Sequence, residues 1–389
     1  MGRAMEFFDV VVIGGGPAGM AAALQCTMYN VQCTVGDEDA RDVGARGLRV
    51  LLVERGDLLG GILNQCTHLG FGLSYFGEEL TGQEYARRFA TRIEASGVEV
   101  FTDTTVLEVG ADRVITISGG ETGFRRISAG AVVLATGCRE RPIGALPVAG
   151  SRPTGIFTAG AAQKMLNLGG YDIGARFVIL GSGDVGLIVA RELALRGKDV
   201  IAVIEKKAEC GGLERNRINC LERFGIPLVT RTTVSEVHGM PRISGVTVTD
   251  VSGGRRFIEC DTLITSVGLI PERELLEWRV ESGEWSVRDE GTRGVPGWLF
   301  LCGNAAFVHD VVDDVSFESE RVGGLAAASL QRDSAVSGGD ASGELGDVGA
   351  QDGVQGGVGV ICLACPKECV GVLGADGWLG LACGRESPG

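Results

Sequence analysis

The stretch Asp9-Val-Val-Val-Ile-Gly-Gly-Gly-Pro-Ala-Gly19 sets the predicted fold, because it places glycines at a strand-to-helix turn. An apolar run of strand length precedes the glycines, and an alanine-rich run of helix length follows them. In such a turn the first glycine permits a sharp bend, the second lets the backbone approach a pyrophosphate, and the third lets the helix pack on the strand. Free N–H groups at the helix N-terminus favour the diphosphate charge. The sequence therefore predicts a dinucleotide at Gly14, Gly16, Ala18 and Gly19.

A second stretch, Phe177-Val-Ile-Leu-Gly-Ser-Gly-Asp-Val-Gly186, repeats the pattern with Gly181, Gly183 and Gly186. It also lies between an apolar run and a helix-length run rich in alanine and leucine. A single glycine pattern occurs by chance, but two in this context indicate two nucleotides in one protein. We therefore predict an α/β fold with two Rossmann-like dinucleotide-binding domains.

The second unit ends its next predicted strand on an acidic residue, as a ribose-binding site requires. Glu205 lies 24 residues after Gly181. A carboxylate there suits a ribose 2′-hydroxyl and repels a 2′-phosphate, which favours NAD(H) over NADP(H). Lys206 and Lys207 follow directly and are able to accommodate a phosphate, so NADP(H) stays an alternative.

The first unit has its acid in Glu54, which lies 40 residues after Gly14. The usual spacing is roughly 20 residues. The excess falls in Thr27 to Arg46, which is rich in Asp, Gly, Arg and Cys and has no helical periodicity. We interpret it as a surface insertion between helix and strand, which loop-closure entropy tolerates.

Two further motifs complete the first unit. They are the strand ending in Ala135-Thr136-Gly137 and the stretch from Val295 that ends in Gly303-Asn304. With the first glycine turn and Glu54, this combination resembles the two-dinucleotide flavoproteins of the pyridine nucleotide–disulfide oxidoreductase family over roughly residues 7–332.

That resemblance implies FAD on the first fold and NAD(P)H on the second, inserted fold. It implies that Ala135, Thr136 and Gly137 close the FAD site and that Gly303 and Asn304 contact the FAD phosphate and ribityl chain. Asn304 stands where the family usually has Asp, which keeps an acceptor and loses a charge.

A narrower likeness rests on four stretches: Gly60 to His68, Gly137 to Pro142, Gly155 to Gly160, and His309 to Asp313. They resemble flavoproteins encoded beside glycerol-3-phosphate-type dehydrogenases, which often travel with a small cysteine-rich domain. More distantly, they resemble FAD-binding subunits of sarcosine oxidase and opine dehydrogenase complexes. The likeness implies electron transfer with an FAD-dependent dehydrogenase subunit of one of these types as partner.

The order of motifs predicts the domain organisation. The FAD-binding domain takes residues 1–150 and 269–332, and the NAD(P)-binding domain of residues 151–268 is inserted in it. Residues 333–358 lack apolar periodicity and read as a flexible linker. Residues 359–389 form a short cysteine-rich tail.

Composition indicates a globular enzyme of 389 residues with a net charge of −14, which disfavours nucleic acid and anionic membrane surfaces as partners. The apolar run from Phe7 to Cys26 contains a charged residue and a glycine turn, so we expect a buried strand and no integral membrane segment. Twelve cysteines in a nucleotide-binding enzyme are expected to be thiols or metal ligands, and we expect a cytoplasmic protein.

Cys66 and His309 are the candidate catalytic residues. Cys66 has no partner at the spacing of dithiol reductases, and Cys210 and Cys220 do not form the Cys-x-x-Cys pair of thioredoxin reductases. We interpret Cys66 as a packing thiol, with a flavin-facing thiol that acts through sulfenic acid or a mixed disulfide as the alternative. His309 has either a structural role or a position at the flavin N1–O2 edge, and His68 is interpreted as structural or substrate-lining.

The tail places Cys362, Cys365, Cys369 and Cys383 in one short segment. Four thiolates ligate a [4Fe–4S] cluster or a structural Zn. The flavoprotein context favours the iron–sulfur cluster, because a flavin splits an electron pair into single electrons that a cluster carries. A zinc site and an unmetallated remnant stay as alternatives.

These patterns together predict an FAD-dependent oxidoreductase that passes electrons between NAD(P)H and a partner dehydrogenase or iron–sulfur acceptor. The sequence leaves three alternatives open. One is a single-cysteine NADH oxidase or disulfide reductase that uses Cys66. The others are a non-catalytic FAD-binding redox sensor and a reductase domain that serves an oxygenase.

Overall fold

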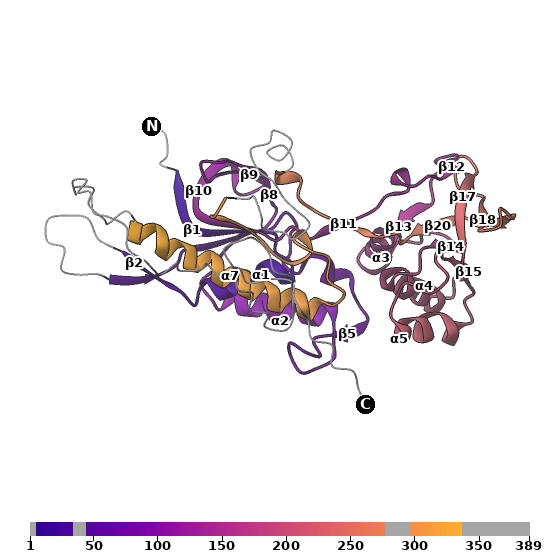
Figure 1. Ribbon diagram of the computed structural model, residues 1–389, viewed down its shortest axis with the longest axis horizontal. Coiled ribbons are helices and arrows are strands. Elements are labelled where there is room, and N and C mark those ends of the chain that lie inside the picture. Colours follow the sequence, from indigo (N-terminus) through magenta and orange to yellow (C-terminus); the bar gives the residue numbers. More distant parts are fainter. Residues whose placement is uncertain (1–4, 34–43, 277–295, 337–389) are drawn as a thin grey trace, which may run out of the picture. The chain divides into compact units, whose positions relative to one another are not determined.

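The computed structural model describes residues 5–33, 44–276 and 296–336. Residues 1–331 form one compact unit, which contains two α/β halves of the same architecture. In each half a mainly parallel sheet carries helices on one face and antiparallel strands on the other (Figure 1). The predicted α/β fold with two Rossmann-like units is confirmed.

The first half is built on a seven-stranded sheet in the order β7-β4-β1-β10-β9-β8, with β22 paired to β10. Strands β7, β4, β1, β10 and β22 are parallel, and β8, β9 and β10 form an antiparallel ribbon. The bounds are β1 Glu6–Ile13, β4 Val50–Val53, β7 Glu99–Phe101, β8 Thr104–Val109, β9 Val114–Gly119, β10 Gly123–Leu134 and β22 Leu299–Leu301.

Strand β1 is buried on both faces, and its alternate residues enter two different cores. Val10 and Val12 pack with helices α1 (Pro17–Cys26), α2 (Gly82–Glu94) and α7 (Val312–Val336). Val11 and Ile13 pack with the antiparallel ribbon on the opposite face. This two-sided burial explains why the run before the first glycines is apolar without alternation.

The predicted insertion of Thr27 to Arg46 contains a two-stranded antiparallel hairpin, β2 (Asn30–Cys33) and β3 (Gly44–Gly47). Arg46 donates two hydrogen bonds to the buried Asp9 carboxylate, at 2.6 and 2.9 Å. Asp9 lies in the middle of β1, whereas the glycine turn follows the end of that strand. The hairpin is therefore anchored away from the turn, which keeps its strand-to-helix geometry.

The second half has a five-stranded parallel sheet in the order β13-β20-β14-β15-β16 and a mainly antiparallel sheet in the order β12-β17-β18-β19, in which only β12 and β17 pair in parallel. Helices α3 (Ala159–Asn167) and α4 (Asp184–Leu195) pack on one face of the parallel sheet, and the antiparallel sheet packs on the other. The bounds are β12 Ala149–Gly150, β13 Ile156–Thr158, β14 Arg176–Leu180, β15 Asp199–Ile204, β16 Leu228–Val229, β17 Thr232–His238, β18 Gly245–Asp250, β19 Arg255–Glu259 and β20 Thr262–Thr265.

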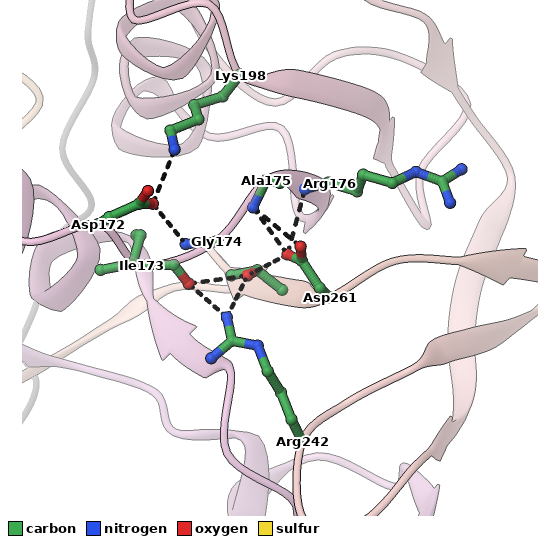
Figure 2. A network of polar contacts seen from close by, with 9 residues as sticks. Asp172, Ile173, Gly174, Ala175, Arg176, Lys198, Arg242 and Asp261 are labelled. Atoms are coloured by element: carbon green, nitrogen blue, oxygen red, sulfur yellow. Dashed lines mark hydrogen bonds and ion pairs between the residues drawn. The ribbon is translucent and has the colours of Figure 1, made fainter.

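A polar network holds the start of β14 (Figure 2). The Asp261 carboxylate accepts hydrogen bonds from the backbone N–H groups of Ala175, at 3.0 Å, and Arg176, at 3.2 Å. The Arg242 guanidinium donates to the Ile173 carbonyl at 2.6 Å. These contacts fix the strand where it enters the sheet, at the end opposite to its glycine turn.

The two connections between the halves pair with each other. Strand β11 (Cys138–Glu140) runs antiparallel to β21 (Leu269–Pro271). Strand β12 already pairs with β17 of the second half, so the chain crosses a few residues before the predicted boundary at residue 150. Helix α7 continues to Val336, four residues into the range predicted as a linker. The rest of that range and the tail lie outside the described residues.

The remaining short elements connect these parts. They are β5 Leu69–Phe71, β6 Leu80–Thr81, α5 Glu214–Asn216, a single π-helical turn at Arg217–Leu221, and 3₁₀ turns at Gly61–Gln65, Ile143–Ala145, Glu222–Phe224 and Gly303–Ala305. None of the helices within the described ranges is both long and apolar enough to cross a membrane.

Candidate functional site

The turn after β1 shows a different requirement at each fingerprint glycine. Gly14 has a φ of +108°, and a Cβ there would lie 2.4 Å from the Ala135 carbonyl oxygen. A Cβ on Gly19 would lie 1.8 Å from the Gly14 carbonyl oxygen. A Cβ on Gly16 would meet no heavy atom within 4 Å. The protein's own packing requires the first and third glycines, whereas the second borders open space, as a pyrophosphate cradle needs.

The turn after β14 repeats this division. Gly181 has a φ of +98°, and a Cβ there would lie 2.0 Å from the Ser266 carbonyl oxygen. A Cβ on Gly186 would lie 2.8 Å from the Ser266 Cβ. At Gly183 the nearest contact would be 3.7 Å away. Both turns therefore have space for a phosphate at the second glycine, and both dinucleotides of the predicted pair fit the residues present.

The two predicted acids are held in equivalent ways. Glu54 accepts the backbone N–H of Gly15 at 2.6 Å and that of Gly56 at 2.7 Å. Glu205 accepts the backbone N–H of Ser182 at 3.0 Å and that of Lys207 at 2.8 Å. In each half, the residue after the first glycine and the residue two positions after the acid are the donors.

This arrangement fixes both carboxylates at the edge of their glycine turns and leaves their remaining lone pairs for ribose hydroxyls. Burial opposes the charge of Glu205, but the hydrogen bonds from Lys207 and Ser182 outweigh it and lower the pKa of this carboxyl. Glu205 is therefore ionised at neutral pH. The donors Gly15 and Ser182 were not predicted, because each pairs a turn with a strand end far along the chain.

The segments expected to close the first site lie around the first glycine turn. The Ala135 N–H donates to the Ile13 carbonyl at 2.8 Å, which extends β10 alongside β1 up to the turn. A Cβ on Gly303 would lie 2.6 Å from the Ala18 Cβ, so this glycine sits against the start of α1. Thr136 donates to the Glu272 carbonyl at 2.6 Å, which ties the segment to the chain that returns from the second half.

Asn304 has both ends of its amide engaged. Its Oδ1 accepts the backbone N–H of His309 at 3.0 Å, and its Nδ2 lies 3.6 Å from the Cys138 Sγ. The acceptor that the sequence predicted for the ribityl chain is therefore already shared with His309. Cys138 is a neighbour that the sequence analysis did not single out.

His309 packs edge-on against Phe307, with 5.5 Å between the ring centroids. Its Nδ1 is buried and has no hydrogen-bond partner among the described residues. Glu318 of α7 lies in the same region, and its Oε2 accepts the Gly303 backbone N–H at 2.8 Å. Sequence analysis missed Glu318, because nothing in the helical pattern distinguishes it from the other acids of α7.

Cys66 is a buried thiol with no sulfur partner in the part of the chain that the structure describes. Its Sγ lies 3.5 Å from the Ile62 carbonyl oxygen and 3.9 Å from the Gln163 Oε1. Burial, and next the charge of Glu192, raise the pKa of Cys66 to about 12. A thiol of this kind is not a thiolate nucleophile at neutral pH.

The turn before Cys66 joins the two halves. The Gln65 amide donates to the Gly160 carbonyl at 2.9 Å and to the Gln163 Oε1 at 3.1 Å. Gly160 in turn donates its N–H to the Glu140 carboxylate, at 2.8 and 2.9 Å. His68 is half-buried, contacts the Leu69 carbonyl through Nδ1 at 2.9 Å and packs on Phe71. It lies outside this network.

Residues 5–33, 44–276 and 296–336 contain no group of three or more His, Cys, Asp or Glu that could hold a metal ion. The predicted metal ligands lie outside these ranges, in the cysteine-rich tail. They are Cys362, Cys365, Cys369 and Cys383.

Curated relatives are components of larger enzymes. An opine oxidase subunit from Agrobacterium tumefaciens (strain Ach5) is 27% identical over 331 residues, which are 77% of this chain and 62% of that protein. The alpha subunit of sarcosine oxidase from Rhizobium meliloti (strain 1021) is 30% identical over 217 residues, which are 52% of this chain and 19% of that protein. The chain spans less than two thirds of either relative.

A solved structure supports the fold. The crystal structure of T. acidophilum thioredoxin reductase matches with a TM-score of 0.63 at 21% identity, over 85% of this chain and 99% of that one. The family model described as pyridine nucleotide-disulphide oxidoreductase matches residues 8–327, which include both glycine turns and both acids. The chain belongs to the pyridine nucleotide-disulphide oxidoreductase family.

Proposed function

We propose that the chain binds FAD on the first half and NAD(P)H on the second and passes electrons between NAD(P)H and a partner protein. The observation that carries this proposal is the repeated turn. In each half, the first glycine of the turn has a positive φ and the second glycine borders open space. The carboxylate that ends the next strand accepts hydrogen bonds from two backbone N–H groups. A protein with a single nucleotide would not need the second copy. Substitutions at Gly16 and Gly183 test it, because each should remove one cofactor only.

Bound FAD supplies the capacity to accept a hydride and release single electrons, and the protein supplies orientation and electrostatics. Gly14 and Gly16 let the backbone approach the pyrophosphate, and Glu54 binds the adenosine ribose. Ala135, Thr136 and Gly137 with Gly303 and Asn304 close the site. The N-terminus of α7, which begins at Val312, would present its N–H groups and positive dipole end to the negative charge of the reduced cofactor.

On the second half, Gly181, Gly183 and Gly186 hold the nicotinamide dinucleotide, and Glu205 binds its ribose. We propose NADH as the preferred donor, because the ionised carboxylate repels a 2′-phosphate. The Glu205 carboxylate is held by three hydrogen bonds, including one from the Ser182 hydroxyl at 2.6 Å. The exposed Lys206 and Lys207 side chains follow directly, so the relative rates with NADH and NADPH test this assignment.

Electrons leave the flavin to an acceptor outside the two nucleotide sites. The curated relatives are named as subunits, which supports a partner dehydrogenase or oxidase subunit for this chain. The glycerol-3-phosphate and the sarcosine or opine types are the candidates that the sequence resemblance implies. Mixing the reduced protein with each type of purified dehydrogenase under anaerobic conditions tests them, because the right partner reoxidises the flavin.

We propose that Cys362, Cys365, Cys369 and Cys383 bind a [4Fe–4S] cluster that accepts electrons from FAD. Four thiolates match an iron–sulfur cube or a tetrahedral zinc. Metal analysis of anaerobically prepared protein should find about four irons per chain. Stoichiometric zinc without iron would indicate a structural zinc site in the tail. The partner protein would then accept electrons directly from FAD.

The single-cysteine reductase is disfavoured by the burial of Cys66, whose pKa of about 12 leaves it protonated at neutral pH. A redox sensor would bind the same nucleotides but oxidise NADH negligibly. Steady-state assays of NADH oxidation with an artificial electron acceptor distinguish it from an oxidoreductase. We propose that the protein lies in the cytoplasm, since Cys26, Cys66, Cys138, Cys210, Cys220, Cys260 and Cys302 are free thiols. Free thiols are typical of a reducing compartment.

A further inference from the structure

Glu318 is a half-buried carboxylate that the proposed electron path does not use. Besides the Gly303 N–H at 2.8 Å, its Oε2 accepts the Ser319 hydroxyl at 3.3 Å. Gly303 is itself wedged between α1 and α7, since a Cβ there would lie 2.6 Å from the Ala18 Cβ and 3.2 Å from the Val315 Cγ1. Glu318 is therefore tied through Gly303 to the chain segments that the proposed function assigns to FAD.

The titratable groups that face Glu318 come from three elements. His309 lies in the loop before α7, Arg321 lies on α7, and the Cys302 thiol lies at the end of β22. Burial raises the pKa of Glu318, and its hydrogen bond to Gly303 and the charge of His309 only partly oppose this. Burial, and next the charge of Glu318, also raise the pKa of Cys302, which stays a neutral thiol.

Resting on the proposed function, we propose that Glu318 takes up a proton when the flavin is reduced. The hydride leaves C4 of the nicotinamide with the electron pair of its C–H bond and forms a new bond at the flavin. The nicotinamide gains one positive charge, and the flavin gains one negative charge. The Glu318 carboxylate then takes one proton from solvent and becomes neutral, so the flavin and Glu318 together keep their net charge while the flavin holds both electrons.

The physical reason is the cost of placing two negative charges in one partly buried site. Like charges in a low dielectric repel strongly, so reduction disfavours the ionised form of a nearby carboxylate. Burial disfavours the charged form of Glu318 even before the flavin is reduced, which makes protonation on reduction easier. Its hydrogen bond from Gly303 is the route by which protonation reaches the FAD-binding segment, because a neutral carboxyl accepts this bond more weakly.

Proton uptake on reduction tests the proposal directly. Wild-type holoprotein and Glu318→Gln are reduced anaerobically with dithionite in lightly buffered solution at several pH values around neutrality, with a pH indicator present. Gln keeps an acceptor for the Gly303 N–H and cannot titrate. Asp314→Asn is the matched control, because it removes an exposed acid from the same helix. Protons released by dithionite are common to all three proteins and cancel in the comparison.

We expect wild type and Asp314→Asn to take up the same number of protons per flavin, and Glu318→Gln to take up fewer, by up to one. Equal uptake by all three proteins would overturn the proposal. If Glu318→Gln does not retain flavin, the reduced-minus-oxidised infrared spectrum of wild type decides. A new carboxylic-acid C=O band supports Glu318, and its absence overturns the proposal.

The outcome separates the two proposals. Dithionite reduces a bound flavin whether or not NADH does, so equal proton uptake overturns the role of Glu318 and leaves the proposed function standing. A flavin that dithionite reduces but NADH does not would refute the NADH-dependent function alone. Protein without any FAD would overturn both.

Discussion

Gly16→Val should separate FAD binding from folding. Gly16 has φ −74° and ψ −176°, an extended conformation that any L-residue adopts, and a Cβ there would meet no heavy atom within 4 Å. Valine therefore fits the apoprotein, and its effect on the free energy of unfolding should stay within about 0.5 kcal/mol, as for an ordinary surface substitution. The added methyl groups nevertheless fill the space through which the pyrophosphate approaches the backbone.

The expected loss of FAD affinity is at least about 100-fold, or about 2.7 kcal/mol. Titration of apoprotein with FAD, followed by flavin fluorescence, measures this loss, and circular dichroism during heating measures the stability. Gly14→Val is the contrasting variant, because a Cβ there would lie 2.4 Å from the Ala135 carbonyl oxygen at a φ of +108°. It should lower the melting temperature as well as the affinity.

Gly183→Val is the matched control in the other half, where φ is −66° and the nearest contact of a Cβ would be 3.7 Å away. It should keep FAD and lose NADH, as measured by a higher KM for NADH in a dye-reduction assay. The reasoning is refuted if Gly16→Val holoprotein carries a full complement of flavin, or if Gly183→Val loses flavin and keeps its KM for NADH.

Three further changes have expected outcomes. Glu205→Ala should narrow the kcat/KM gap between NADH and NADPH, whereas faster reduction of wild type by NADPH would show that Lys206 and Lys207 dominate. Cys66→Ser should leave NADH-to-dye activity largely intact, and a fall of about 100-fold or more, worth roughly 2.7 kcal/mol in the barrier, would favour a thiol mechanism. Because its folded pKa of about 12 exceeds the ordinary value of 9.0, Cys66 contributes stability below pH 9 that is lost as the pH rises toward 12, which pH-dependent unfolding measures. Asp261→Ala should lower the free energy of unfolding by about 1–2 kcal/mol, since it removes the acceptor of two backbone N–H groups at the start of β14. Its flavin absorbance should stay unchanged, and a lost flavin would contradict a purely structural role.

The glycine turns were predictable because their geometry is local. Gly14 and Gly181 need a positive φ, and Gly19 and Gly186 need close helix packing, so the residue type itself reports the structure. Glu54 was also predictable, although the inserted hairpin lengthened its spacing. The hairpin is anchored at Asp9, away from the turn, and the strand-to-acid relation of the motif is preserved.

Contacts between distant segments could not be predicted in the same way. Glu318 accepts from Gly303 because β22 ends beside α7, and Gln65 meets Gly160 because the two halves come together there. The sequence around an acidic residue in a helix, or around an amide side chain in a turn, contains no pattern that identifies a hydrogen-bond partner in a distant segment. The buried state of Cys66 is a further case, because its pKa depends on the packing of several segments around the sulfur.

The central claim is that one chain holds both nucleotides and moves electrons between them. Its most direct test is an anaerobic titration of purified FAD-loaded protein with NADH, followed by flavin absorbance and by electron paramagnetic resonance. We predict that the oxidised flavin band bleaches progressively as NADH is added. A flavin that dithionite bleaches but that neither NADH nor NADPH reduces would contradict it.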